Sequence, residues 1–322
     1  MTAVKLKKGA SLAVTAAIFI LLLWFSEAAL SGAARGLELC ANVIVPTLLP
    51  FFVLSDMLCA MGLPGYLGRC FDKLFLSLFG VGGAGASAFI LGLTGGYPLG
   101  ARAVGELHRS GEINAREARR LVLFCNNSGP AFIIGMAGVG IFHSAGLGML
   151  FYFAHALAAL AVGMLLCRSV PRHSTPRQAI CALELSDAIS SAMTRAVKST
   201  AMISGFIIFF SMLSGIFLSS GLLGELVLLL CGHTPLSPAQ AQALLLGLME
   251  LGGGISAMGS LGAEPINLAI CSFLLGWGGL SVHFQTASVL SSYGIKAQGM
   301  VAAKLLHGAI AAGITYLFAL II

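Results

Sequence analysis

Long apolar runs fill most of this chain, and short polar segments separate them. A helix that crosses a bilayer needs roughly 20 predominantly apolar residues. The runs of about that length, in chain order, are 9–30, 37–63, 121–142, 146–167, 200–222, 266–291 and 299–322. The pattern therefore predicts an all-α polytopic membrane protein that crosses the bilayer seven times.

The remaining apolar segments are too short or too interrupted to be simple spans, and they are 64–79, 84–107, 223–231 and 240–260. In the first, Arg69, Asp72 and Lys73 stand among aromatic and aliphatic residues, which predicts a helix in the membrane interface. The third predicts a short apolar helix. The second and fourth are broken by glycine-rich turns, so we predict two re-entrant helical hairpins.

Basic residues predict the orientation, because cytoplasmic loops carry an excess of lysine and arginine. Three lysines precede the first span and place the N-terminus in the cytoplasm. The five arginines between positions 102 and 120 lie inside only if 84–107 is a hairpin. Glu27 and Arg35 make a poor cleavage site, so we favour a retained first helix over a cleaved signal peptide. Seven crossings then place the C-terminus outside.

Composition removes several classes of function. Charged residues are 9% of the chain, against roughly a quarter in soluble proteins, and 58% of residues are hydrophobic. The net charge of +6 encodes orientation in such a protein, so we expect no nucleic-acid partner. The eight cysteines are scattered singly and lack metal-binding spacing. Nucleotide-binding, serine-hydrolase and zinc-protease motifs are missing, so we expect no enzyme, cofactor or metal site.

The two halves of the chain resemble each other in the order of their elements. Segments 45–65 and 204–224, offset by 159 positions, share six of 21 residues. The turn TGGYPLG corresponds to ELGGGIS, and NNSGP at 126–130 corresponds to GWGGLS at 276–281. The charge rule runs the two copies in opposite directions, which predicts an inverted-topology repeat of the kind found in secondary transporters. The predicted parts are an N-terminal transmembrane helix at 1–36, a first repeat at 37–167, a cytoplasmic linker at 168–198 and a second repeat at 199–322.

Paired helix breaks at matching positions predict a binding site near the membrane midplane. The unpaired N–H groups at the start of each second half-helix attract an anion, and carbonyls at the end of the first half can hold a cation. The candidate substrate-binding residues at the four breaks are Thr94, Gly95, Gly96, Tyr97 and Pro98; Asn126, Asn127, Ser128 and Gly129; Glu250, Gly252 and Gly253; and Gly278, Gly279 and Ser281.

Several of these candidates also have a simpler structural explanation. Asn126 and Asn127 can cap a kink made by Pro130, although two successive asparagines exceed what a kink needs. Glu250 can pair with a basic residue, but an intramembrane carboxylate favours a functional role and makes proton coupling possible. Trp277 can stack on a flat ligand or anchor the chain in the interface. Isolated histidines in apolar runs predict hydrogen-bonded structural roles, here for His155, His283 and His307.

Two stretches resemble the YlbJ-like sporulation integral membrane proteins: VPTLLPFFVLSDML at 45–58, and the segment from Thr94 to Phe142 with its GYPLGA turn and NNSGP break. The resemblance covers most of 37–322, and in the second half it rests mainly on element order and ELGGG. These proteins carry nucleoside-recognition Gate repeats similar to those of concentrative nucleoside transporters. By motif position, the resemblance implies Gate elements at 94–98, 126–130 and 250–254.

The resemblance also implies a role in spore formation and transport of dipicolinate, a flat pyridine dicarboxylate. The protein would lie in the cell membrane or a forespore membrane. We therefore favour a secondary transporter of a small organic anion. Two alternatives stay open: the same fold carrying nucleosides or nucleobases, and a non-transporting scaffold for spore assembly that docks partners on its charged loops. Expected partners are the bilayer and the substrate, with a homo-oligomer by analogy with trimeric nucleoside transporters.

Overall fold

The computed structural model describes residues 2–167 and 183–321, and this part of the chain is helical almost throughout. The helices of the first half are α1 Thr2–Trp24, α2 Ser26–Leu39, the π-helix η1 Cys40–Ile44, α3 Val45–Ala60, α4 Leu63–Phe79, α5 Gly83–Gly95, α6 Leu99–Arg109, α7 Ala115–Cys125, the π-helix η2 Ala131–Ile141 and α8 Ala145–Cys167. Those of the second half are α9 Leu185–Ser219, α10 Leu222–His233, α11 Pro238–Met249, α12 Leu251–Gly259, α13 Pro265–Trp277, α14 Gly279–Ser292 and α15 Met300–Ala319.

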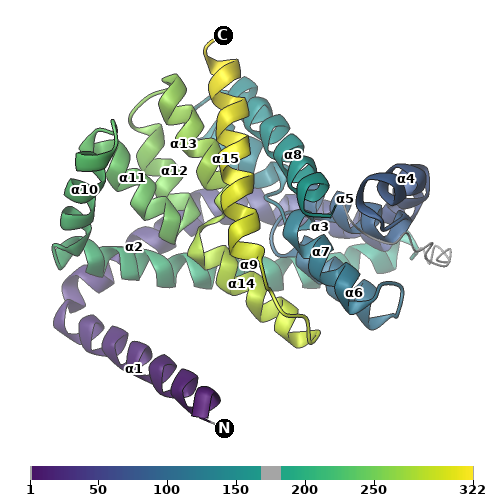
Figure 1. Ribbon diagram of the computed structural model, residues 1–322, viewed down its shortest axis with the longest axis horizontal. Coiled ribbons are helices and arrows are strands. Elements are labelled where there is room, and N and C mark those ends of the chain that lie inside the picture. The colour runs from purple at the N-terminus through teal and green to yellow at the C-terminus, as the bar shows by residue number, and fades with distance from the viewer. Residues whose placement is uncertain (1, 168–182, 322) are drawn as a thin grey trace.

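Two long helical segments lie side by side and run in opposite directions (Figure 1). One consists of α2, η1 and α3, which follow one another without interruption over residues 26–60, and the other is α9. Gly32 lies against the backbone of Ser211 on α9, and Gly215 of α9 lies against the backbone of Ala28. Small residues let helix backbones approach closely in a membrane. The antiparallel pair therefore joins the two halves of the chain.

Replacing Gly215 by alanine should loosen this pair. The added methyl carbon would lie 2.5 Å from the Ala28 carbonyl oxygen and 3.2 Å from the Gly32 Cα. Overpacking of this kind costs about 1–3 kcal/mol, so we expect a thermal unfolding midpoint lower by several degrees. Gly205→Ala is the control, because a methyl there meets no atom within 4 Å and alanine favours a helix. Equal midpoints for the two variants would contradict close packing at Gly215.

The predicted repeat is visible in the backbone. Gly62 and Gly221, which are 159 positions apart, adopt φ angles of +86° and +79°. Each precedes a helix, α4 in the first half and α10 in the second. Only glycine enters this left-handed region readily, so the shared Gly-Leu pair makes the same sharp turn after each long helix.

Both halves then continue in the same order, with a hairpin followed by a broken helix. We call these elements hairpin 1 (α5 and α6, meeting at 96–98), break 1 (126–130, between α7 and η2), hairpin 2 (α11 and α12, meeting at Glu250) and break 2 (Gly278 and Gly279, where α13 meets α14). The structure confirms the predicted fold class, a helical membrane protein with an inverted repeat, broken helices and two helical hairpins.

Two helix boundaries differ from the sequence prediction. The predicted first span, 9–30, ends too late, because α1 ends at Trp24 and the chain bends by 98° into the next helix. The residues after the bend pack on α9 and so belong to the long segment formed by α2, η1 and α3. The predicted span 200–222 starts too late, because α9 begins at Leu185. Its first turns occupy the end of the predicted linker 168–198, of which 168–182 lie outside the described residues.

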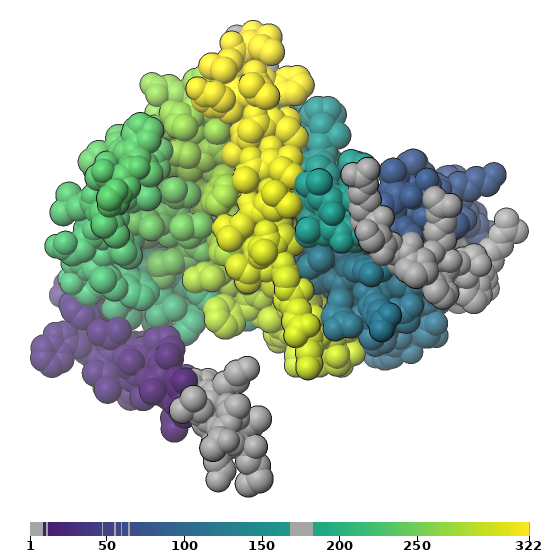
Figure 2. Space-filling model, viewed as in Figure 1, coloured from purple at the N-terminus to yellow at the C-terminus, as the bar shows by residue number. Residues whose placement is uncertain are grey.

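Within the described ranges, four helical segments are long and apolar enough to cross a membrane, or up to six if each bent pair is one span. The four are α8, α9, α13 with α14, and α15. Helix α1 lies apart from the body of the molecule (Figure 2). Its Leu12, Phe19 and Trp24 are 71%, 61% and 80% exposed, which suits contact with lipid. The protein is therefore a multi-pass membrane protein, while the orientation of its termini stays a prediction.

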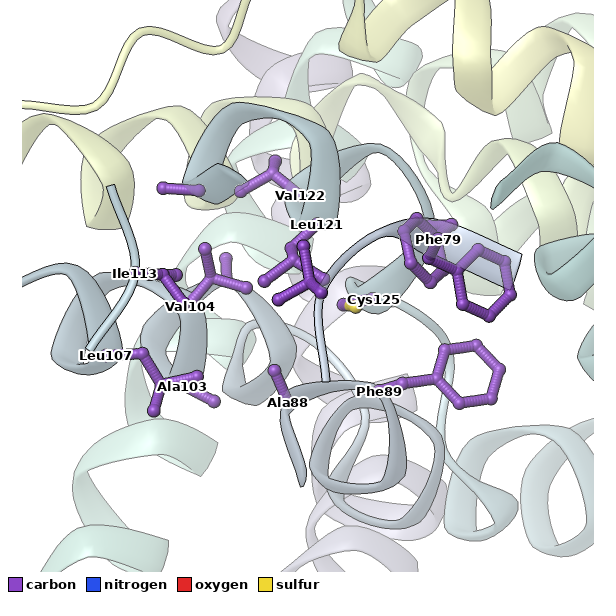
Figure 3. Packing of buried hydrophobic residues seen from close by; sticks show 14 of the residues in the cluster. Phe79, Ala88, Phe89, Ala103, Val104, Leu107, Ile113, Leu121, Val122 and Cys125 are labelled. Atoms are coloured by element: carbon purple, nitrogen blue, oxygen red, sulfur yellow. The ribbon is translucent and has the colours of Figure 1, made fainter. Parts of the chain in front are cut away.

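A hydrophobic core holds hairpin 1 against the helix that leads into break 1. Side chains of α5, α6 and α7 converge there, among them Phe89, Val104 and Leu121 (Figure 3). Phe79 of α4 stacks on Phe124, with ring centroids 4.8 Å apart. A second cluster packs η1, η2, α12 and α13 together around hairpin 2. The two cores thus fix both hairpins relative to the helix breaks.

Candidate functional site

A cavity of about 50 Å³ lies where both hairpins, break 1 and the start of α14 meet. Its polar wall comes from hairpin 1 (Thr94, Gly95, Gly96, Tyr97), break 1 (Ser128, Gly129), hairpin 2 (Glu250) and α14 (Ser281, Gln285). Apolar residues of α3, α9 and η2 complete it, including Phe52, Ile203 and Phe132. We call this the central cavity.

Hairpin 1 touches break 1 through two glycines. A Cβ atom on Gly96 would lie 2.8 Å from the Gly129 nitrogen, and one on Gly129 would lie 2.9 Å from the Gly96 nitrogen. Gly96 also has a φ of +73°, a region that side chains disfavour. The two backbones can therefore approach only because neither residue has a side chain.

Hairpin 2 is closed by a carboxylate. Glu250 is 3% exposed and is the N-cap of α12. Its Oε1 accepts a hydrogen bond from the Gly252 N–H at 2.8 Å, and its Oε2 accepts one from the Gly253 N–H at 2.6 Å. A carboxylate at a helix N-terminus satisfies unpaired N–H groups and complements the helix dipole. The glycines after Glu250 thus present their backbone to the carboxylate.

Hairpin 2 also touches its own break through a glycine. Gly279 has a φ of +78°, and a Cβ atom there would lie 3.0 Å from the Leu251 nitrogen. Each half of the repeat therefore presses a hairpin turn against a glycine of its broken helix. A contact between the halves adds to this, because a Cβ atom on Gly278 would lie 3.2 Å from the Tyr97 hydroxyl.

Polar atoms on the cavity wall lack partners within the protein. The Oε1 of Gln285 is buried without a hydrogen bond to any described residue, and the buried hydroxyls of Tyr97 and Ser128 have no partner beyond each other. Buried polar groups in native proteins nearly always have a partner, in protein or in water. These poorly satisfied groups, on residues that line one cavity, therefore indicate a site that takes up water or a polar ligand.

The structure brings together eight of the candidate residues around the central cavity: Thr94, Gly95, Gly96, Tyr97, Ser128, Gly129, Glu250 and Ser281. The others lie just behind this wall. Pro98 borders a smaller cavity of about 20 Å³ on the other side of hairpin 1. Gly252 and Gly253 bind the Glu250 carboxylate. Gly278 and Gly279 make the backbone contacts described above.

The two asparagines face away from the cavity and tie break 1 to its neighbours. Asn126 Oδ1 accepts a hydrogen bond from the Ala101 N–H at 3.2 Å, and its Nδ2 donates to Thr286 Oγ1 at 2.8 Å. Asn127 Nδ2 donates to the Phe124 carbonyl at 2.8 Å. Asn126 thus links break 1 to hairpin 1 and to α14.

Asn126→Ala should lower the thermal unfolding midpoint by several degrees. The change leaves a buried N–H and a buried hydroxyl short of a partner, and each such group costs about 1–3 kcal/mol. Asn42→Ala, on the exposed face of η1, serves as the control. Unchanged midpoints in both variants would show that the Asn126 contacts do not stabilise the fold.

A larger cavity of about 480 Å³ lies on the far side of hairpin 2. Polar residues of α2, η1, α9 and α12 line it: Arg35, Glu38, Asn42, Ser211, Ser214 and Ser256. Glu250 borders both this cavity and the central one. The turn of hairpin 2 at Glu250 therefore separates the central cavity from this larger cavity.

Three polar residues around the breaks were not predicted from the sequence. Gln285 lines the central cavity, and Thr286 binds Asn126. Lys304 is buried behind break 1, where it contacts His307. The signal for Lys304 was present, because an ionisable residue in an apolar span favours a functional role. Trp277 is neither an interfacial anchor nor free to stack, since it is buried and its Nε1–H donates to the Leu248 carbonyl at 3.0 Å.

Comparison with solved structures defines the class of fold. CNTnw, a concentrative nucleoside transporter, is similar in an intermediate state, with a TM-score of 0.60, 16% identity and coverage of 99% of this chain and 86% of that one. Its inward-facing, substrate-bound state gives a TM-score of 0.58, 15% identity and coverage of 98% and 86%. The chain therefore has the fold of these transporters.

Sequence comparison identifies the family. No family model matches the chain. The sporulation integral membrane protein YlbJ of Bacillus subtilis (strain 168) is 31% identical over 311 residues, which cover 89% of this chain and 76% of YlbJ. The chain belongs to the YlbJ-like sporulation integral membrane protein family.

Proposed function

We propose that this protein is a secondary transporter that carries a small organic anion, dipicolinate by family resemblance, through the membrane of a sporulating cell. The observation that carries the proposal is the central cavity, where both hairpins, break 1 and the start of α14 meet around three polar side chains with few protein partners. A binding site at paired breaks of an inverted repeat is the arrangement of many secondary transporters. The substrate would lie between the two halves of the chain.

Helix ends around the cavity favour an anion. Ser128 and Gly129 precede η2, Ser281 lies in the first turn of α14, and Tyr97 lies just before α6. Helix N-termini carry a partial positive charge and present N–H groups. A flat dicarboxylate offers two anionic ends, one for each half of the repeat.

Glu250 is compatible with this proposal. Its two carboxylate oxygens are already engaged by the N–H groups of α12, so it serves as that helix's own anion. The substrate's carboxylates are then left to the helix ends of break 1, break 2 and hairpin 1. Glu250 would act by holding hairpin 2 closed rather than by contacting the substrate's charge.

The cavity sizes fit a closed conformation of such a transporter. The central cavity, at about 50 Å³, is much smaller than the cavity of about 480 Å³ that Glu250 also borders, as expected when the hairpins close over the site. Each hairpin has a further cavity behind it. The cavity behind hairpin 1 has a volume of about 20 Å³, and the cavity behind hairpin 2 has a volume of about 480 Å³. In an inverted repeat these would open to opposite sides of the membrane. Alternate opening of the two hairpins would then expose the central site to each side in turn.

A nucleoside or nucleobase is the second candidate substrate. The fold similarity to CNTnw and the neutral partners offered by Tyr97, Ser128 and Gln285 favour it. These groups can hydrogen-bond to the edge of a base. The two candidates differ in charge, which makes them separable by competition.

Equilibrium binding to the purified protein tests the proposal. We expect labelled dipicolinate to bind saturably, unlabelled dipicolinate to displace it, and uridine and adenosine to have no effect. Gln285→Ala should weaken binding, whereas Gln242→Ala, on the exposed face of α11, should not. Saturable binding of uridine or adenosine without dipicolinate binding would replace the anion with the second candidate. Binding of neither class would contradict the proposal.

A further inference from the structure

A buried lysine occupies the back of break 1. Lys304 of α15 is 2% exposed, and its Nζ donates a hydrogen bond to the Asn126 carbonyl oxygen. The same nitrogen lies 3.4 Å from Asn127 Oδ1, 3.3 Å from His307 Nδ1 and 5.4 Å from the centre of the Tyr97 ring. All these partners are neutral acceptors or an aromatic face. Between residues 2–167 and 183–321, no ion pair includes Lys304.

Two histidines continue the contact toward the central cavity. His307 Nε2 lies 3.0 Å from the His155 carbonyl oxygen, which can only accept, so Nε2 carries the proton and Nδ1 accepts from Lys304. The Ser128 N–H donates to His155 Nε2 at 3.2 Å, so the proton of neutral His155 is on Nδ1. That Nδ1 is buried without a partner, and the two rings are 4.3 Å apart. Hydrogen bonds to the backbone and ring of His155, together with the contact between the two rings, therefore link Lys304 to Ser128, a residue of the cavity wall.

On the basis of the proposed transport function, we propose that the network of Lys304, His307 and His155 is a proton-binding site, and that the proton moves together with the anionic substrate. The Nζ lone pair of Lys304 takes up a proton from the more acidic side of the membrane. The ammonium gives the proton up on the other side, and the lone pair returns. The step changes no covalent bond other than this N–H bond.

The geometry explains how the proton acts on the substrate site. An ammonium has three N–H donors, and three acceptors surround Nζ: Asn126 O, Asn127 Oδ1 and His307 Nδ1. A neutral amine has only two donors, so deprotonation releases one of these contacts. Two of the three acceptors belong to break 1, and the next residue, Ser128, lines the cavity. Proton occupancy therefore sets how firmly break 1 is held.

Electrostatic attraction favours movement of the proton and the anionic substrate in the same direction. The carboxyl end of α7, at Asn126, attracts a cation, and an ammonium there attracts an anion into the adjacent cavity. A buried ammonium without a carboxylate is otherwise costly, so a bound anion stabilises the protonated state and the reverse also holds. The titratable groups that interact with Lys304 are Tyr97 of hairpin 1, Cys125 of α7, His155 of α8, His283 of α14 and His307 of α15.

Proteoliposomes loaded with buffer test this inference. We expect an inward proton gradient to drive accumulation of labelled dipicolinate, up to about tenfold per pH unit for one coupled proton. Lys304→Met should abolish the accumulation but leave exchange of labelled for unlabelled dipicolinate measurable. Lys304→Arg should do the same, because arginine keeps its charge and cannot cycle, whereas it would rescue a purely structural cation. Lys296→Met removes an exposed lysine before α15 and should behave like the wild type.

Accumulation that ignores the proton gradient in the wild type, or that survives in Lys304→Met, would overturn the inference while leaving the transporter intact. A second readout does not depend on transport. In protein with ¹⁵N-labelled lysine, one side-chain resonance should be lost in Lys304→Met and should shift with pH across the neutral range in the wild type. A Lys304 resonance that does not move with pH would overturn the inference, even if dipicolinate is not the substrate.

Discussion

Glu250→Ala should reduce transport of the anion by at least about thirtyfold. The change leaves the N–H groups of Gly252 and Gly253 unpaired at a buried helix start, and loss of such a cap costs about 2 kcal/mol or more. Since 2 kcal/mol is about a thirtyfold change in an equilibrium, the closed form of hairpin 2 loses about thirtyfold in population relative to the open form. Uptake into proteoliposomes measures the loss.

Two variants separate this role from a general effect of charge. Glu264 also precedes a helix, α13, but its exposed side chain makes no capping hydrogen bond, so Glu264→Ala should transport like the wild type. Glu250→Gln keeps one acceptor oxygen and should retain more activity than Glu250→Ala. Full activity in Glu250→Ala, in protein that remains folded, would show that closure of hairpin 2 does not require the carboxylate.

Gly279→Ala should abolish transport as well. Its φ of +78° disfavours any side chain by about 1–2 kcal/mol. The methyl carbon would also lie 3.0 Å from the Leu251 nitrogen and 3.3 Å from the Met249 carbonyl oxygen, inside normal contact distance. Hairpin 2 and break 2 would have to separate, which distorts the central cavity. Substrate binding and uptake, measured together, report the effect.

The control for Gly279→Ala has the same backbone conformation and open surroundings. Gly262 has a φ of +89°, and a methyl carbon there would meet no atom within 4 Å. Gly262→Ala should therefore lower stability slightly and leave uptake unchanged. If both alanine variants lose uptake equally, backbone strain explains the effect, and the contact between hairpin 2 and break 2 does not.

Much of the fold follows from local patterns in the sequence. The length of apolar runs identified most helices, and the turns at Tyr97 and Glu250 and the break at Asn126 are where glycine, proline and polar residues interrupt those runs. The bend after Trp24 was not predicted, because hydropathy does not distinguish a helix that crosses lipid from one that packs on α9. That choice depends on small residues such as Gly32 meeting a distant segment.

The candidate site followed from sequence only in part. Helix breaks can be predicted because glycine, proline and polar residues mark them locally in the sequence. Two of the residues found in this way, Ser128 and Glu250, do border the central cavity. The direction of a side chain around a break is not local, so Asn126 was expected at the substrate and instead binds Thr286. Lys304 and His155 come from different helices, and only the packing of α15 on α8 joins them in one network.

Uptake of labelled dipicolinate into proteoliposomes that contain the purified chain tests directly whether the protein carries this anion at a site between its hairpins and breaks. We expect saturable uptake by the wild type, retained uptake in Glu264→Ala, and loss in both Glu250→Ala and Gly279→Ala. Uptake that remains saturable in all of these variants would contradict a site between the hairpins and the breaks. No saturable uptake by folded wild-type protein would contradict transport of this anion.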